Sequence, residues 1–149
     1  MNNDVKVIIK SRRTSIKDSY KDTTTKRVII SISSTAYRFP YFNKSNPAVK
    51  AILYLSFDDV LDNEEFYGCS AISNEDAFKI VNFVNNSIDT LDIDAIEVHC
   101  DAGVSRSAGV GAAILKYLKG DDSEIFDNPY FCPNDTCYKK VLNMFFRNS

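Results

Sequence analysis

The residues best suited to chemistry lie together in one short segment, residues 99–108. The segment reads His-Cys-Asp-Ala-Gly-Val-Ser-Arg-Ser-Ala, so five residues separate Cys100 from Arg106. A β-branched apolar run precedes the cysteine, and a long apolar run follows the arginine. This order is typical of a short loop that leaves a strand and enters a helix. A nucleophile and an anion-binding side chain would then share one loop.

Such a loop can hold an oxyanion without a metal ion. Its backbone N–H groups can turn inward to form a concave nest, and the N-terminus of the next helix adds free N–H groups and partial positive charge. Gly103 allows a conformation or a close approach that a side chain would block. The planar guanidinium of Arg106 can bind two oxygens of one phosphate. We therefore expect the phosphate-binding residues to be Asp101, Ala102, Gly103, Val104, Ser105 and Arg106.

Cys100 is expected at the floor of this nest. The field that holds phosphate also favours thiolate over thiol, and a thiolate beneath a bound phosphate is a positioned nucleophile. Ser107 could donate a hydrogen bond to the sulfur, first as nucleophile and later as leaving group. His99 is expected to point away from the pocket and to steady the loop. A lone cysteine or arginine is more often structural, but their combination around Gly103 favours catalysis.

The rest of the chain predicts an α/β fold that would position this loop. Short apolar or alternating runs are typical of strands, and segments of 3.6-residue periodicity are typical of helices. Strands that alternate with helices predict a central, mostly parallel sheet flanked by helices, with ligands beyond the carboxyl ends of the strands. The predicted strands are 5–9, 27–33, 48–57 and 95–99, and the predicted helices are 74–88, 105–118 and about 134–146.

The composition indicates a single domain over residues 1–149. A hydrophobic fraction of 44% is ordinary for a globular protein, and the length suffices for a core. The charge is uneven, +5 over residues 1–27 and −7 over the rest, and the basic start is expected to be a solvated surface segment. Basic patches interleaved with aromatic residues are absent, so no nucleic-acid partner is expected. The first apolar run is too short for a signal peptide or a membrane span, which predicts a cytoplasmic protein without a membrane partner.

The four cysteines are expected to be free thiols. The chain has one histidine, and Cys132 and Cys137 do not show the ligand spacing of a zinc site, so no metal and no cofactor is expected. Without a secretory signal, the even cysteine count does not indicate disulfides. A reactive Cys100 could form a regulatory disulfide with Cys69, and the alternative is an ordinary buried thiol at position 69.

His99-Cys100, the five residues that follow, and Arg106-Ser107 resemble the signature loop of the protein tyrosine phosphatase superfamily, and residues 101–109 resemble its dual-specificity branch. The resemblance implies one phosphatase domain with a phosphotyrosine protein phosphatase-like fold. It also implies a two-step hydrolysis through phosphocysteine, without a cofactor, on a phosphorylated protein. The segments 57–59, 120–122 and 130–134 further resemble a subgroup of compact phosphatase-like proteins, which indicates no particular substrate.

The resemblance also implies a general acid, an aspartate that follows the strand before the preceding helix. The predicted strand 48–57 runs directly into Asp58 and Asp59. Continued alternation would place Asp59 in phase with the inward apolar residues, so Asp59 is the first candidate, Asp58 the second and Asp62 the third. A purely solvated acidic turn is the alternative. Asp59 precedes the nucleophile by 41 positions, more than in compact dual-specificity members, and the extra residues lie in 63–70.

The resemblance implies phosphotyrosine monoesters as substrates, and a shallow pocket would admit phosphoserine and phosphothreonine too. Phosphoinositide-directed relatives often carry lysines in the loop, whereas this loop has Asp101 and no lysine. Nearby acids would repel a polyanionic lipid or RNA end. Two alternatives stay open: a phosphoprotein-binding pseudophosphatase, and an RNA, nucleotide or lipid phosphatase on the same loop. The acids expected near the site are Asp58, Asp59, Asp62, Glu64 and Glu65.

Overall fold

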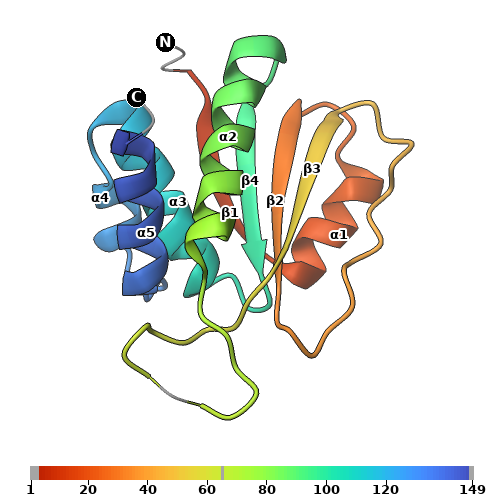
Figure 1. The fold of residues 1–149 in the computed structure, drawn as a ribbon. Coiled ribbons are helices and arrows are strands. Elements are labelled where there is room, and N and C mark those ends of the chain that lie inside the picture. Colours follow the sequence, from red (N-terminus) through yellow and green to blue (C-terminus); the bar gives the residue numbers. More distant parts are fainter. Residues whose placement is uncertain (1–3, 65, 148–149) are drawn as a thin grey trace.

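A four-stranded sheet with helices on both sides forms the centre of the molecule (Figure 1). The computed structural model describes residues 4–64 and 66–147. The strands lie in the order β1-β4-β2-β3, and each neighbouring pair is parallel. The α/β class predicted from the sequence is therefore confirmed. The strands are β1 (Lys6–Ser11), β2 (Arg27–Ser33), β3 (Val49–Ser56) and β4 (Ala95–Cys100).

Five helices connect and cover these strands in the described part of the chain. The three predicted helices are present with ends shifted by one or two residues, but the sequence pattern predicts neither α1 nor the one-turn α4. No helix of the described residues is both long enough and apolar enough to cross a bilayer. The helices are α1 (Arg12–Lys21), α2 (Asn74–Thr90), α3 (Arg106–Lys119), α4 (Ser123–Phe126) and α5 (Asp135–Arg147).

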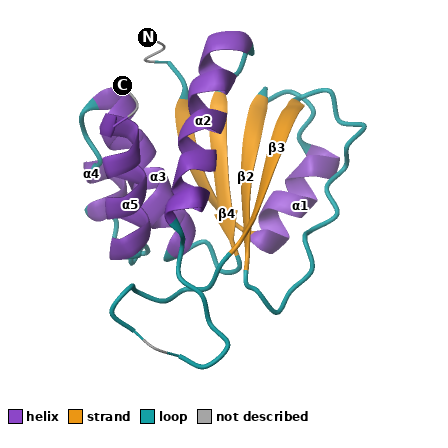
Figure 2. Ribbon diagram, viewed as in Figure 1, coloured by secondary structure: helices purple, strands orange, loops and turns teal. Residues whose placement is uncertain are grey.

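One face of the sheet is apolar and packs against α2 and α3, and α5 packs on these two helices (Figure 2). The side chains of Val28, Ile30, Ile96 and Val98 are fully buried there. Apolar burial contributes about 25 cal/mol per Å², so this layer is the main source of stability. Helix α3 is buried on nearly every side, as its sequence predicts, because it packs against both the sheet and α5. It ends at Gly120, whose φ of 75° makes a left-handed cap.

The opposite face of the sheet is polar, which explains why the sequence pattern misses α1. Arg27 and Glu97 are both fully buried, with the Arg27 Nε 3.2 Å from the Glu97 Oε1. Lys10 Nζ lies 2.8 Å from the same oxygen, and Ser15 of α1 donates to the other carboxylate oxygen. The inner face of α1 is thus polar. The expectation of a solvated basic segment is wrong for Lys10 and Arg27, whose charges are compensated inside the protein.

All strands end at the same edge of the sheet, at the lower side of Figure 1. Three loops meet there: residues 34–48 after β2, residues 57–73 after β3, and residues 101–105 after β4. The second of these loops ends at α2, which begins with a capping box between Ser73 and Asp76. Parallel topology therefore brings the segment singled out by sequence next to two loops that are distant from it in the chain.

Candidate active site

The loop of residues 100–106, called the phosphate loop below, turns its carbonyl groups outward. No backbone N–H of residues 101–106 donates a hydrogen bond to another group of the described chain. Consecutive N–H groups without protein partners in a short loop at a helix N-terminus are the donors of an anion-binding nest. Three carbonyl groups of the loop accept bonds from outside it: Asp101 O from Arg12 N–H (3.2 Å), Val104 O from Cys132 N–H (2.9 Å) and Ser105 O from Asn134 N–H (3.0 Å).

Gly103 meets two demands that no other residue could meet together. Its φ of 73° lies in the left-handed region. A Cβ at this position would also lie 2.7 Å from the carbonyl carbon of Lys10 and 2.7 Å from the backbone nitrogen of Ser11. The phosphate loop therefore rests directly on the backbone at the end of β1.

Cys100 ends β4 with its side chain only 2% exposed. Its Sγ lies 3.0 Å from the Oγ of Ser107, on the first turn of α3. His99 points to the other face of the sheet, where its Nε2 lies 2.6 Å from Ser31 Oγ and its ring packs on Phe42. Burial lowers the pKa of His99 to about 4, so its imidazole is neutral at pH 7.

Arg106 keeps part of its guanidinium free for a ligand. Its side chain is 6% exposed, and Nη1 donates to Ser34 Oγ (3.0 Å) and Phe57 O (2.9 Å). Nη2 donates to Asp101 Oδ2 (2.9 Å), while Nε is buried without a hydrogen-bond partner among the described residues. A buried donor without a partner costs about 1–3 kcal/mol. Nε and Nη2 share the edge that binds two oxygens of one phosphate.

Asp101 fixes this orientation of the guanidinium. Its Oδ2 accepts from Arg106 and from Ser34 Oγ (2.6 Å), while its Oδ1 is buried without a partner among the described residues. Sequence reasoning assigned Asp101 only to the backbone nest and missed Ser34 entirely. The position of Ser34 directly after β2, beside β4 in a parallel sheet, is the signal that could have indicated it.

Asp59 is the acid that contacts the phosphate loop. Its Oδ1 accepts hydrogen bonds from Ser105 Oγ (2.7 Å) and from Asn134 Nδ2 (2.9 Å). The side chain is exposed, so it can reach a bound substrate. A pocket of about 260 Å³ opens beside it. Leu61, Ser105 and residues 132–135 form the rest of the pocket lining.

Asp58 serves the structure of its own loop instead. It is 8% exposed, and it accepts bonds from Thr35 N–H (3.0 Å), Thr35 Oγ1 (2.8 Å) and Ser70 N–H (2.9 Å). Burial raises the pKa of Asp58, but these hydrogen bonds and the charge of Arg106 outweigh it and hold the pKa below its usual value. A carboxylate so committed is a poor proton donor at neutral pH.

The predicted strand alternation is wrong beyond Ser56, although the contacts favour Asp59 as the acid. Strand β3 ends at Ser56, and the chain turns at Asp58, whose carbonyl oxygen accepts from Val60 N–H (3.0 Å). Phe57 and Asp58 are therefore both buried while Asp59 is exposed, which breaks the alternation.

Asp62 and Glu64 form no hydrogen bond or ion pair with the phosphate loop among the described residues. Asp62 pairs with Lys140 Nζ at 3.0 Å, and its N–H donates to Thr136 Oγ1 (3.1 Å). Glu64 accepts from Leu61 N–H at 2.7 Å. Glu65 lies outside the described residues. The negative charge beside the site thus comes mainly from Asp58, Asp59 and the partly paired Asp101.

All four cysteines have free thiols in this structure. Cys69 is exposed on the loop after β3, and its disulfide with an oxidised Cys100 stays a prediction. Cys137 is buried in α5, and burial raises the pKa of its thiol, so this cysteine is unreactive. Within residues 4–64 and 66–147, no group of three or more His, Cys, Asp or Glu could hold a metal ion.

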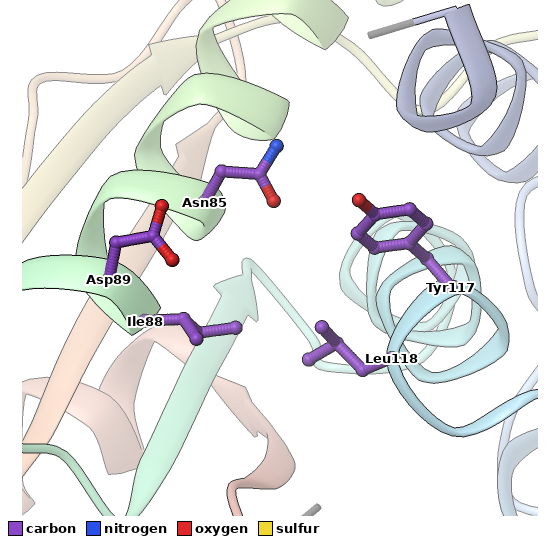
Figure 3. Close-up of a pocket in the computed structure, with 5 residues that line it drawn as sticks. All are labelled: Asn85, Ile88, Asp89, Tyr117 and Leu118. Carbon is purple, nitrogen blue, oxygen red and sulfur yellow. The ribbon is translucent and has the colours of Figure 1, made fainter. Parts of the chain in front are cut away.

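A second pocket, of about 250 Å³, lies between α2 and the C-terminal end of α3 (Figure 3). Figure 3 shows Asn85, Ile88 and Asp89 of α2 facing Tyr117 and Leu118 of α3. It is at the opposite end of α3 from Arg106. These side chains include no cysteine, histidine or arginine, so this pocket lacks the groups needed for phosphate chemistry.

Solved structures with this fold include phosphatases and phosphatase-like proteins. The human tyrosine phosphatase-like serine/threonine/tyrosine-interacting protein has a TM-score of 0.61 at 18% identity, over 95% of this chain and 92% of that one. Human DUSP28 gives 0.60 at 17% identity, over 95% and 92%. PTPMT1 in complex with PI(5)P gives 0.56 at 16% identity, over 95% and 91%. No family model and no curated protein sequence matches the chain. The chain thus has the fold of the dual-specificity phosphatases.

Proposed function

We propose that this chain, built on the dual-specificity phosphatase fold, is a metal-independent cysteine phosphatase that hydrolyses phosphotyrosine monoesters in proteins through a phosphocysteine intermediate. One observation carries the proposal: the Cys100 thiol lies at the base of a loop whose N–H groups of residues 101–106 are free, beside an arginine with a buried, unpaired Nε. These donors match the oxygens of a phosphate, and the sulfur would then lie beneath the phosphorus.

In the first step, the Cys100 thiolate attacks phosphorus, an S–P bond forms and the ester P–O bond breaks. Asp59, protonated before the step, donates its proton to the leaving oxygen. The free backbone N–H groups and the Nε–Nη2 edge of Arg106 bind the three non-bridging oxygens, where negative charge accumulates. The contact between Asp101 and Nη2 holds this edge in position without occupying Nε.

In the second step, water replaces the sulfur at phosphorus. The Asp59 carboxylate accepts a proton from the attacking water, the S–P bond breaks, and inorganic phosphate leaves. Ser107 Oγ, 3.0 Å from the sulfur, donates a hydrogen bond that stabilises the departing thiolate. Because Cys100 must stay reduced, a reducing compartment such as the cytoplasm suits the activity.

The charges around the loop support a phosphoprotein rather than a polyanionic substrate. Asp101 lies in the phosphate loop, and Asp58 and Asp59 lie in the loop beside it. A ligand with several phosphates would bring its other charges against these carboxylates. A phosphotyrosine in an extended segment presents one dianion and a neutral ring. Phosphoserine and phosphothreonine present the same dianion on a shorter, aliphatic side chain.

The proposal is tested with purified protein, p-nitrophenyl phosphate and a chelator. We expect turnover that disappears in Cys100→Ser, together with a burst of one p-nitrophenolate per site in the wild type if phosphocysteine breakdown is slow. Phosphotyrosine, phosphoserine and phosphothreonine peptides then define the preference, with phosphoinositides and RNA 5′-triphosphate as competing substrates. Peptide binding without hydrolysis would establish a pseudophosphatase, and activity confined to the lipid or RNA would replace the phosphoprotein assignment.

The acid is tested with Asp59→Asn. General acid catalysis contributes about 10²–10⁴-fold, and the loss should be greatest for substrates whose leaving oxygen needs a proton. We therefore expect phenyl phosphate to lose at least about 100-fold in kcat/KM, with a smaller loss for p-nitrophenyl phosphate. Equal losses for the two substrates would assign the acid elsewhere.

A further inference from the structure

Asn134 joins three parts of the active site at one buried position. It directly precedes α5, is 6% exposed, and follows the segment 130–133, which the proposed mechanism leaves without a role. Its backbone N–H donates to Ser105 O of the phosphate loop at 3.0 Å. Its side-chain Nδ2 donates to Asp59 Oδ1 at 2.9 Å and to Val60 O at 3.2 Å. One residue thus links the phosphate loop, the acid and a helix.

The surroundings of Asn134 leave it little freedom. Its Oδ1 accepts from Cys137 N–H at 2.9 Å and so caps α5, and its carbonyl oxygen accepts from Tyr138 N–H at 3.0 Å. A Cβ at Gly109 of α3 would lie 2.5 Å from that same carbonyl oxygen, so α3 and residue 134 are in direct backbone contact. The amide nitrogen that faces Asp59 is therefore held from several sides.

The two hydrogen bonds to Asp59 decide which of its oxygens can carry a proton. Ser105 Oγ and Asn134 Nδ2 both donate to Oδ1, and an oxygen that accepts from an amide N–H and a hydroxyl has no place for a proton of its own. While both bonds are in place, the acidic proton resides on Oδ2. Of the two donors only Asn134 is an obligatory one, because a serine hydroxyl can rotate to donate elsewhere.

We propose that Asn134 is a positioning residue for the general acid: it holds Asp59 against the phosphate loop and keeps the transferable proton on Oδ2. This inference rests on the proposed function, since it concerns the same reaction. Asn134 contacts neither the phosphate nor the leaving group, and it acts only through Asp59. The loop that carries Asp59 has further ties to α5, between Asp62 N–H and Thr136 Oγ1 (3.1 Å) and between Lys140 Nζ and Ile72 O (2.9 Å).

A merely structural role as helix cap can be separated from this positioning role by the choice of variant. Serine caps helices about as well as asparagine, but it has no amide to donate to Asp59. Asn134→Ser therefore keeps the cap and removes the contact, whereas Asn134→Ala removes both. Asn128→Ser is the matched control, because Asn128 lies in the same connection and its side chain accepts a hydrogen bond only from Tyr130 N–H among the described residues.

The experiment measures kcat/KM of the full chain with phenyl phosphate and p-nitrophenyl phosphate. We expect Asn134→Ser to lose about 10-fold on phenyl phosphate and less than about 3-fold on p-nitrophenyl phosphate, because a misplaced acid matters most for the poorer leaving group. In the Asp59→Asn background, the same substitution should change neither value, since the group that it positions is already gone. Asn128→Ser should match the wild type throughout.

Three results would overturn the proposal. Wild-type rates for Asn134→Ser on both substrates would show that the hydrogen bond from Asn134 to Asp59 does not affect catalysis. Equal losses of kcat/KM on both substrates, with a lowered melting temperature, would show that Asn134 only stabilises the fold as the cap of α5. A full further loss in the Asp59→Asn background would show that Asn134 acts on something other than the acid. If the wild-type protein hydrolysed neither substrate, the proposed function would be wrong, and this inference would be wrong with it.

Discussion

The phosphate loop and the loop after β3 that carries the acid, residues 57–73, are held in place in opposite ways. In the phosphate loop, the carbonyl groups are fixed by backbone N–H groups of neighbouring segments. The second is held largely by side chains that are remote in the chain, among them Thr35, Ser105, Asn134 and Lys140. Substitution of those side chains should move the acid. The nest should instead be sensitive to substitution of its own residues, above all Gly103, which rests on the backbone of Lys10 and Ser11.

The largest effect is expected from Arg106→Lys, which keeps a positive charge but removes the planar guanidinium that can bind two oxygens. The lysine cannot bind two oxygens from one planar group, nor reach Phe57 O and Asp101 together as Arg106 does. We expect kcat/KM on p-nitrophenyl phosphate to fall by at least about 10³-fold, similar to the loss of a major oxyanion donor. Vanadate binding should weaken in parallel. A loss below tenfold would mean that the backbone nest alone holds the phosphate.

The next largest effect is expected from alanine substitution at two glycines, Gly103 and Gly120. Their comparison separates the cost of steric clash from the cost of a positive φ. Gly103 and Gly120 have nearly equal φ values, 73° and 75°, but a Cβ would clash with Lys10 and Ser11 only at Gly103. Gly120→Ala should cost about 1 kcal/mol in unfolding free energy, from conformation alone. Gly103→Ala should cost about 2–5 kcal/mol, because the clash adds to that strain, and should nearly abolish activity. Urea unfolding of both variants checks this, and equal losses would contradict it.

A pH-dependent effect is expected from His99, which lies beneath the phosphate loop. Its pKa is lowered from 6.5 to about 4, chiefly by burial, so between these values the unfolded chain binds a proton that the folded protein does not. Its contribution to stability is therefore complete above pH 6.5 and is lost as the pH falls toward 4. The loss amounts to about 3 kcal/mol at 1.36 kcal/mol for each unit of pKa shift.

His99→Gln isolates this contribution, because glutamine can still bond to Ser31 but does not titrate. Urea unfolding at several pH values should show the stability difference between wild type and variant changing by about 3 kcal/mol from pH 4 to 6.5. Above pH 6.5 the difference should be constant. A difference that is independent of pH across the whole range would show that His99 is not buried as a neutral group.

The smallest effect is expected from Asp58→Asn, in the loop that carries the acid. The amide can no longer accept all three hydrogen bonds from Thr35 and Ser70, so we expect a loss of about 1–3 kcal/mol at pH 7. Because the pKa of Asp58 is lowered on folding, this loss should shrink as the pH falls below 3.8, where the unfolded wild type takes up the proton before the folded protein does.

Asp92→Asn is the control for that measurement, since Asp92 forms a surface ion pair with Lys26 at 2.6 Å. Such exposed pairs are screened by solvent and contribute little to stability. Asp58→Asn should also lower the rate with phenyl phosphate a few-fold, because Thr35 and Ser70 no longer fix the loop next to Asp59. Equal stability losses for the two variants would mean that burial of Asp58 adds nothing.

The parts of this protein in which function is local can be predicted from the amino-acid sequence. The spacing of Cys100, Gly103 and Arg106 predicts the nest, because backbone donors, a positive φ and a helix terminus all arise within seven residues. Apolar periodicity likewise predicts α2, α3 and α5, since these helices bury apolar stripes. It fails for α1, whose inner face packs on the buried pair Arg27–Glu97 and is polar.

The residues that the other loops place beside the nest cannot be predicted from the sequence, because they depend on the tertiary fold. The sequence places Asp58 and Asp59 side by side, and a turn after Ser56 buries one under Thr35 and Ser70 and exposes the other. Ser34 and Asn134 reach the site from positions far from it in the chain. Hydrogen bonds between distant residues depend on how parallel strands bring their carboxyl ends together, and neither spacing nor composition records that arrangement.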